Sequence, residues 1–138
     1  MTLSKAHRTY FNIAKEASYL SDFPKIKIGA IAVYGHRVIS SGYNSCKTNP
    51  LQKKYNKQRF AKDTKHMTHA ELMCLKPLLW RNDIDFKHVS LYIYREDQNN
   101  ELALSRPCLS CLKLISELGI RHIYFTNNGG YSHEEILA

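Results

Sequence analysis

Two short motifs constrain the fold of this sequence more than any other feature does. Residues 69–71 read His-Ala-Glu, and residues 107–111 read Pro-Cys-Leu-Ser-Cys. Each motif stands where an apolar repeat of helical spacing begins, which predicts that each opens a helix. Cys108 follows His69 by 39 positions (108 − 69), so a strand and a return loop fit between the two motifs. The fold must therefore accommodate a helix, a strand and a second helix in that order.

The spacing of apolar residues along the chain predicts alternating helices and strands. The predicted helices cover residues 3–20, 69–81 and 109–118, and the predicted strands cover residues 26–34, 38–43, 89–94 and 120–126. Pro77 should end or kink the second helix. The polar, basic stretch 44–68 is predicted as a long loop, and the tail from residue 134 as one helical turn. This order predicts one α/β domain over residues 1–138, a three-layer α/β/α sandwich with a mixed sheet.

The sequence shows neither a membrane span nor a secretory signal. Its longest apolar runs, such as residues 28–34, are too short to cross a bilayer. The first residues contain no apolar stretch of the signal-peptide kind. We therefore expect a cytoplasmic protein without membrane contact, whose Cys-x-x-Cys pair serves metal or redox chemistry and not a disulfide.

The two cysteines of the second motif suit a metal site. Cys108 and Cys111 are three positions apart, so both sulfurs face one side of a first helical turn and can bind one ion. His69 adds a third ligand of the kind that Zn²⁺ takes, and three protein ligands leave the fourth tetrahedral position open for water. Such an open position is typical of a catalytic zinc ion. Glu71 is not needed as a ligand, and it can move protons between that water and a substrate.

A Cys-x-x-Cys pair alone also suits a redox site or half of a zinc finger. His-x-Glu followed by Pro-Cys-x-x-Cys is the signature of zinc-dependent nucleobase deaminases. With these residues in place, the chain resembles the cytidine and deoxycytidylate deaminase superfamily along most of its length. Residues 28–46 are similar to the deoxycytidylate deaminases and the tRNA adenosine deaminases, with Gly29 in a strand next to the site and Asn44 in the turn that follows.

The resemblance implies a cytidine deaminase-like fold, a bound Zn²⁺ and a homo-oligomeric assembly. It implies that Asn44 contacts the base or sugar of the substrate and that the backbone of Ala70 contacts the pyrimidine edge. Residues 95–106 depart from the deoxycytidylate deaminases, in which the third strand runs almost directly into Pro-Cys. We expect an extra hairpin there. Loops that flank the site set substrate choice in this superfamily, so the substrate stays open.

Positive charge is concentrated in residues 47–65. This segment holds seven Lys and Arg residues against one Asp, a net charge of 7 − 1 = +6. Such a patch attracts phosphate-bearing partners, although a solvated basic loop without a ligand has the same composition. The tyrosine in the segment suits stacking on a base of one nucleotide or of a single strand. The candidate contacts to a phosphate or a strand are Lys53, Lys54, Tyr55 and Lys57.

Three functions are compatible with these residues. The leading interpretation is zinc-dependent hydrolytic deamination of cytosine in a nucleotide such as dCMP, which gives the uracil nucleotide and ammonia. The second keeps this chemistry but acts on cytosine or adenine in single-stranded DNA or RNA, where the base is splayed from its neighbours. The third is a zinc-stabilised nucleic-acid-binding module without turnover, in which Glu71 would have no role.

Four other residues carry structural expectations. Cys46 and Cys74 are expected as small buried side chains and not as metal ligands. Trp80, near the end of the second predicted helix, is expected in the core. Tyr131 is a candidate for closing over the substrate pocket.

Overall fold

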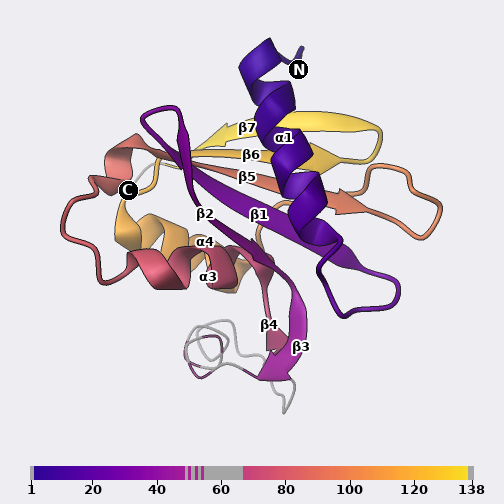
Figure 1. Cartoon of the computed structure of the whole chain (residues 1–138), viewed down its shortest axis with the longest axis horizontal. Helices are drawn as coiled ribbons and strands as arrows, with labels where there is room; N and C mark the ends of the chain where they lie inside the picture. Colours follow the sequence, from indigo (N-terminus) through magenta and orange to yellow (C-terminus); the bar gives the residue numbers. More distant parts are fainter. Residues whose placement is uncertain (1, 49, 51, 53, 55–66, 137–138) are drawn as a thin grey trace.

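The computed structural model describes residues 2–48, 50, 52, 54 and 67–136 of the chain (Figure 1). Its helices are α1 (Lys5–Ser18), α3 (Ala70–Leu75) and α4 (Leu109–Leu118), with the 3₁₀ helices η1 (Lys76–Leu78) and η2 (Phe86–His88). Its strands are β1 (Lys27–Tyr34), β2 (Arg37–Tyr43), β3 (Ser45–Thr48), β4 (Met67–Thr68), β5 (Val89–Glu96), β6 (His122–Asn127) and β7 (Gly130–Glu135). No helix within these ranges combines the length and the apolar character that crossing a membrane requires.

A five-stranded mixed sheet in the order β2-β1-β5-β6-β7 forms the middle layer of the fold. β5 and β6 run parallel, and the other neighbouring pairs run antiparallel. Helix α1 covers one face of this sheet, and α3 and α4 lie on the other face (Figure 1). The predicted α/β/α sandwich with a mixed sheet is therefore confirmed.

The central strands β1 and β5 are apolar on both faces, as their position between two helical layers requires. On the α1 side, Phe11 packs with Ile31 and Tyr92. On the other side, Ala32 and Ile93 pack with apolar side chains of α3 and α4. Because successive residues point to opposite faces, each strand contributes to two cores and reads as a nearly continuous apolar run.

A close approach between β2 and α3 sets the position at which this helix begins. A Cβ atom at Gly42 would meet the Ala70 carbonyl oxygen and the Cys74 nitrogen, each at 2.5 Å. Side-chain atoms avoid contacts this short, so the backbone of α3 can rest on β2 only because residue 42 is glycine. The Ser40 hydroxyl adds a second link by donating a hydrogen bond of 2.6 Å to the Cys74 carbonyl. The first turn of α3 is thereby held against the sheet.

The second helix is shorter than the predicted range of 69–81. α3 ends at Leu75 and continues as η1, which contains Pro77. Proline has no N–H group for the α-helical hydrogen bond and its ring crowds the preceding turn, so the helix tightens and stops there. Trp80 lies beyond η1 and is 83% exposed, so its expected place in the core is wrong.

Residues 134 and 135, where the helical turn of the tail was predicted to begin, belong to a strand instead. β7 pairs antiparallel with β6, and Glu135 lies opposite His122. Gly129 in the turn between them has a φ of 96°, a conformation that favours glycine. The Tyr131 ring packs on Phe11 under α1, with ring centroids 4.6 Å apart. This contact places it on the face of the sheet opposite α3 and α4, so the expectation that it closes over a pocket at those helices is wrong.

The segment 44–68, predicted as a loop, carries a short strand near each end. β3 and β4 pair antiparallel, and β4 leads directly into His69. Cys46 in β3 is exposed, against expectation, because β3 projects beyond the main sheet, whereas Cys74 is buried as expected. Three of the predicted phosphate contacts lie outside the described residues, namely Lys53, Tyr55 and Lys57.

Candidate active site

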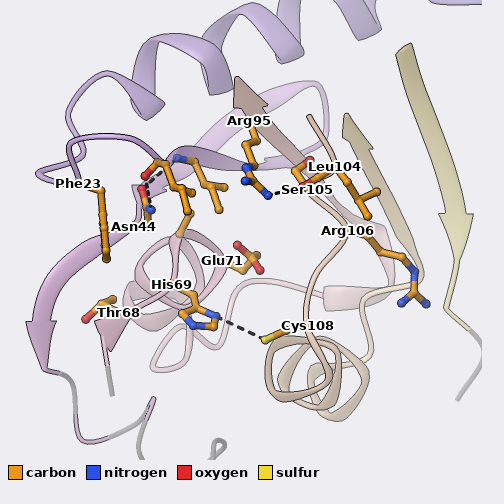
Figure 2. A pocket seen from close by; sticks show the side chains of 13 residues that line it. Phe23, Asn44, Thr68, His69, Glu71, Arg95, Leu104, Ser105, Arg106 and Cys108 are labelled. Atoms are coloured by element: carbon orange, nitrogen blue, oxygen red, sulfur yellow. Dashed lines mark hydrogen bonds between the residues drawn. The ribbon is translucent and has the colours of Figure 1, made fainter. Parts of the chain in front are cut away.

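The two sequence motifs meet at the N-terminal ends of α3 and α4. His69 is the N-cap residue of α3 and Cys108 is the N-cap residue of α4, while Cys111 lies in the first turn of α4. Nδ1 of His69 lies 3.5 Å from Sγ of Cys108 and 3.3 Å from Sγ of Cys111. The three predicted metal ligands therefore converge, and Figure 2 shows His69 and Cys108 turned toward each other.

The geometry of this cluster fits a zinc ion. Tetrahedral bonds of about 2.3 Å to sulfur and about 2.0 Å to nitrogen place the two ligand atoms about 3.5 Å apart. The observed separations agree with this value, and all three donor atoms lie within 4.8 Å of one another. Within the described part of the chain, no other His, Cys, Asp or Glu belongs to the cluster. An ion held by these three side chains would therefore keep one position open, as a catalytic zinc ion does.

The two thiols of the cluster differ in charge when no metal is bound. A hydrogen bond with the Cys111 thiol holds the pKa of Cys108 well below its usual range, and the His69 ring adds to this effect. The same hydrogen bond, together with burial, raises the pKa of Cys111. The pair therefore shares one proton. A divalent cation that displaces this proton gains two thiolate ligands.

Glu71 lies in the first turn of α3, next to the three ligands but outside their cluster. This residue is only 5% exposed. Burial raises the pKa of its carboxyl, and the neighbouring His69 partly offsets the rise. A buried carboxyl with a raised pKa holds a proton more readily than an exposed one does, and such groups serve as general acids and bases in enzymes. Glu71 therefore combines the position and the chemistry of a proton-transfer group.

A pocket of about 290 Å³ opens beside the cluster, and Glu71 lines it (Figure 2). This volume suits a small-molecule ligand. His69 and Cys108 also line the pocket, and in the view of Figure 2 they lie below Glu71, while Arg95 lies above it. Its apolar wall is formed by Phe23, Ile26, Ile28 and Leu104. A flat apolar ring can therefore enter between this wall and the polar groups around the metal position.

Comparison with known proteins identifies the family. The family model for the cytidine and deoxycytidylate deaminase zinc-binding region matches residues 4–127. The chain belongs to this family. It is therefore a zinc-dependent hydrolytic deaminase, and the predictions of this enzyme class and of Zn²⁺ as its cofactor are confirmed. A search of curated proteins finds no significant match to the sequence.

Solved deaminase structures share the fold of this deaminase. A cytidine deaminase from Burkholderia pseudomallei aligns with a TM-score of 0.64 and 19% sequence identity, over 98% of this chain and 93% of that chain. The dCMP deaminase of cyanophage S-TIM5 in its apo form aligns with a TM-score of 0.63 and 20% identity, over 92% of this chain and 86% of that chain. Its complex with dCMP and dUMP gives a TM-score of 0.63 and 18% identity, over 91% and 83% of the two chains. Identities this low establish a common fold and leave the substrate to be argued from the site.

Asn44 lines the pocket of the deaminase and also holds its wall together. Its side-chain oxygen accepts a hydrogen bond of 2.9 Å from the Ile28 N–H, and its amide donates one of 2.8 Å to the Ile26 carbonyl. These bonds fasten the segment that leads into β1. Within the described residues they leave one N–H and one oxygen lone pair of the carboxamide unused. Ala70, the other predicted substrate contact, is fully buried at the start of α3 and also lines the pocket.

Residues 95–106 form the extra hairpin that the sequence suggests. Glu96 pairs with Leu102 in an antiparallel bridge. The Asn100 N–H donates a hydrogen bond of 3.0 Å to the Asp97 carbonyl, which closes the turn. The hairpin leads the chain away from the end of β5 (Figure 1) and returns it toward the start of α4, and residues at both of its ends line the pocket.

A buried polar pair, Ser105 and Thr126, fastens the returning chain to the sheet. Ser105 Oγ donates a hydrogen bond of 3.0 Å to the Ile93 carbonyl and accepts one of 2.9 Å from the Thr126 N–H. The Thr126 hydroxyl donates to the Ala103 carbonyl at 2.7 Å and accepts from the Arg95 N–H at 3.1 Å. This network sets the position of the Pro-Cys-x-x-Cys turn that follows. No motif or periodic signal marks these two residues, and sequence reasoning missed them.

Two arginines of the pocket wall, Arg95 and Arg106, were also missed. Strand alternation could have found Arg95, since it follows Leu91 and Ile93 on the face of β5 that points toward α3 and α4. Arg106 donates two hydrogen bonds of 2.8 Å each to the carboxylate of Glu134 in β7. The pocket therefore carries positive charge of its own, apart from the basic segment.

Proposed function

We propose that this deaminase removes the exocyclic amine of cytosine in a nucleotide such as dCMP, giving the uracil nucleotide and ammonia. The proposal rests on one observation above all. The buried Glu71 carboxyl, with its raised pKa, lines a small pocket beside three side chains of the kind that bind zinc. A structural zinc site has no use for such a carboxyl, whereas hydrolytic deamination needs a group that moves protons next to the metal.

In this proposal His69, Cys108 and Cys111 hold the zinc ion. When bound, the ion lowers the pKa of a water molecule toward neutrality and so supplies the nucleophile. The positive end of the α4 dipole lies at Cys108 and Cys111, which favours their thiolate forms. All three side chains come from helix starts that rest on the sheet, so the fold sets their geometry before the ion binds.

Glu71 is the proposed general acid and base. It takes a proton from the attacking water, passes a proton to the ring nitrogen of cytosine, and delivers another to the amine, which leaves as ammonia. The balance is one water consumed and one ammonia released for each base. Because burial raises its pKa, the carboxyl can hold the proton between the two transfers.

Asn44 and Ala70 are the proposed contacts to the substrate. The unused N–H and lone pair of the Asn44 carboxamide suit a sugar hydroxyl or the edge of a base. The backbone of Ala70 would contact the pyrimidine edge, next to Glu71. The candidates for phosphate contact from the basic segment are Lys53, Lys54, Tyr55 and Lys57, of which Lys54 is exposed.

The cyanophage enzyme supports a nucleotide substrate, since it is described as a dCMP deaminase and has been crystallised with dCMP and dUMP. The Burkholderia protein is described as a cytidine deaminase, so a nucleoside has to be tested as well. The net charge of +6 in residues 47–65 (7 − 1) favours a second candidate, a base in single-stranded DNA or RNA. A homo-oligomeric assembly and a cytoplasmic location stay predictions.

Ammonia release by the purified zinc-loaded protein tests the proposal. The substrates are deoxycytidine, dCMP, dCTP and a short single-stranded oligonucleotide that contains cytosine and adenine, each with Glu71→Gln as the control. Turnover of dCMP that Glu71→Gln abolishes would support the proposal. Turnover of the oligonucleotide alone would establish a polynucleotide deaminase instead, and turnover that Glu71→Gln leaves intact would refute the role of Glu71.

A further inference from the structure

The two arginines of the pocket wall differ in how their charge is compensated. Arg106 forms a two-pronged ion pair with Glu134, with both N···O distances at 2.8 Å. The Arg95 guanidinium donates one hydrogen bond, from Nη1 to the Leu104 carbonyl at 3.2 Å. Its Nε is buried and has no hydrogen-bond partner in the part of the chain that the structure describes. Among the described residues no carboxylate forms an ion pair with Arg95.

The fold holds Arg95 so that this charge faces the pocket. Its backbone pairs with Ile28 of β1, and its N–H donates to Thr126 Oγ1 at 3.1 Å. Figure 2 shows the side chain running from the end of β5 into the pocket, with Glu71 between it and the metal ligands. Arg95 therefore lies on the side of Glu71 away from the metal position, where the part of a substrate that does not react would be bound.

A half-buried guanidinium without a counter-charge carries a cost in desolvation that an anionic ligand removes. A neutral carbonyl could accept a hydrogen bond from the guanidinium but would leave the charge uncompensated. A phosphate group supplies the opposite charge, and its oxygens match the planar, forked donors of arginine. The uncompensated charge of Arg95 in the pocket wall thus calls for an anionic ligand.

We propose that Arg95 binds the 5′-phosphate of the substrate and makes the deaminase selective for nucleotides over nucleosides. This inference rests on the proposed deamination of cytosine and adds a recognition element outside the basic segment. The hairpin 95–106 then serves substrate choice, because it presents Arg95 at one end and holds the Leu104 carbonyl that orients the guanidinium.

Binding measurements in the zinc-loaded Glu71→Gln background test this role without relying on turnover. The dissociation constants of dCMP and deoxycytidine are measured by calorimetry with Arg95, Arg95→Gln and Arg95→Lys. We expect Arg95→Gln to weaken dCMP binding about 10- to 100-fold, the effect of losing one charge-assisted hydrogen bond, and to leave deoxycytidine binding nearly unchanged. Arg95→Lys keeps the charge but not the fork, so it should lose less affinity for dCMP.

Lys113→Gln is the matched control, since it removes one positive charge from the exposed side of α4. It should change neither dissociation constant. Equal weakening of dCMP and deoxycytidine by Arg95→Gln would show that Arg95 contacts the base or supports the fold, and an unchanged dCMP affinity would show that it contacts nothing in the substrate. Either result overturns the inference.

The outcome for Arg95 can be separated from the outcome for the proposed function. If the enzyme with Glu71 releases ammonia from dCMP and Arg95→Gln binds dCMP normally, deamination stands and the role of Arg95 fails. If only an oligonucleotide is deaminated, the free-nucleotide substrate fails. If Arg95→Gln then weakened binding of the oligonucleotide but not of deoxycytidine, which has no phosphate, Arg95 would be assigned to the phosphodiester on the 5′ side of the target base.

Discussion

His69 and Cys108 hold equivalent positions, each as the N-cap residue of a helix, and their ligand atoms lie 3.5 Å apart. Neither side chain makes a capping hydrogen bond to its own helix. Both turn instead toward the same point between the two helices (Figure 2). An N-cap side chain that accepts such a bond typically contributes about 1 kcal/mol to stability, and these two residues forgo it, as residues proposed to bind a metal ion would.

The substitution Cys108→Ser should separate these two roles. Serine is a preferred N-cap residue, so the metal-free variant should unfold at the same temperature as the metal-free parent or at a higher one. Its zinc content should fall strongly, because a serine hydroxyl does not replace a thiolate ligand. Metal analysis and thermal unfolding measure the two effects. Cys46→Ser, at an exposed cysteine, is the control and should keep its zinc; a Cys108→Ser protein that retains stoichiometric zinc would contradict the ligand assignment.

Gly42→Ala should displace the first turn of α3. The added Cβ would meet two backbone atoms of α3 at 2.5 Å, and backbone cannot move aside as a flexible side chain can. We expect a loss of about 1–3 kcal/mol in the free energy of unfolding and weaker zinc binding, since His69 and Glu71 move with the helix. Denaturant unfolding and zinc titration check both. Gly130→Ala is the control, because its Cβ would meet only the Asn127 side-chain oxygen, at 3.3 Å. Equal effects of the two substitutions would contradict the explanation by a clash with the backbone of α3.

Thr126→Val should loosen the loop that carries the Pro-Cys-x-x-Cys turn. Valine has the shape of threonine but leaves the Ala103 carbonyl and the Arg95 N–H without their buried partner. An unsatisfied buried group costs about 1–3 kcal/mol, so stability should fall and turnover with it. Thr9→Val, which removes an exposed hydroxyl of α1, should change neither quantity. Unfolding curves and ammonia release give the comparison, and a Thr126→Val protein as stable as Thr9→Val would refute the role of the network.

The four cysteines should react with an alkylating reagent in an order set by exposure and pKa. Only the thiolate reacts, so a raised pKa shifts reaction to higher pH. Burial raises the pKa of Cys74 to about 12. Partial desolvation and the nearby Asp22 raise the pKa of the exposed Cys46 above its usual range. In the zinc-loaded protein Cys46 should therefore be alkylated increasingly as pH rises, while Cys74 stays unmodified.

Timed iodoacetamide treatment followed by peptide mass spectrometry measures this order. Removal of zinc with a chelator should add Cys108 to the reactive set at pH values where Cys46 is still a thiol, because its pKa is held well below the usual range. Modification of Cys74 at the rate of Cys46 in the folded protein would show that the α3 core opens. Protection of Cys108 that persists after zinc removal would speak against its thiolate form.

The sequence was sufficient for those features whose signals are local. Apolar periodicity predicted the layers and the mixed sheet, since a helix or strand that buries one face must repeat at 3.6 or two residues. The clustering of His69, Cys108 and Cys111 could be predicted because metal chemistry restricts residue types and spacing. Local signals gave wrong predictions at two places. Strand β7 forms where the tail was predicted to begin a helical turn, and Trp80 lies beyond η1, at which the helical segment ends.

The tertiary structure decided which residues surround this cluster and what charge the pocket carries. Ser105 and Thr126 are 21 positions apart and become a pair only when the hairpin returns to β6. Arg106 and Glu134 are 28 positions apart, and their pairing leaves Arg95 as the pocket arginine without an ion pair among the described residues. Hydrogen bonding and charge compensation depend on distances of a few ångströms between segments remote in the chain. The sequence by itself therefore determined the family's chemistry, whereas the substrate-facing charge exists only in the folded pocket.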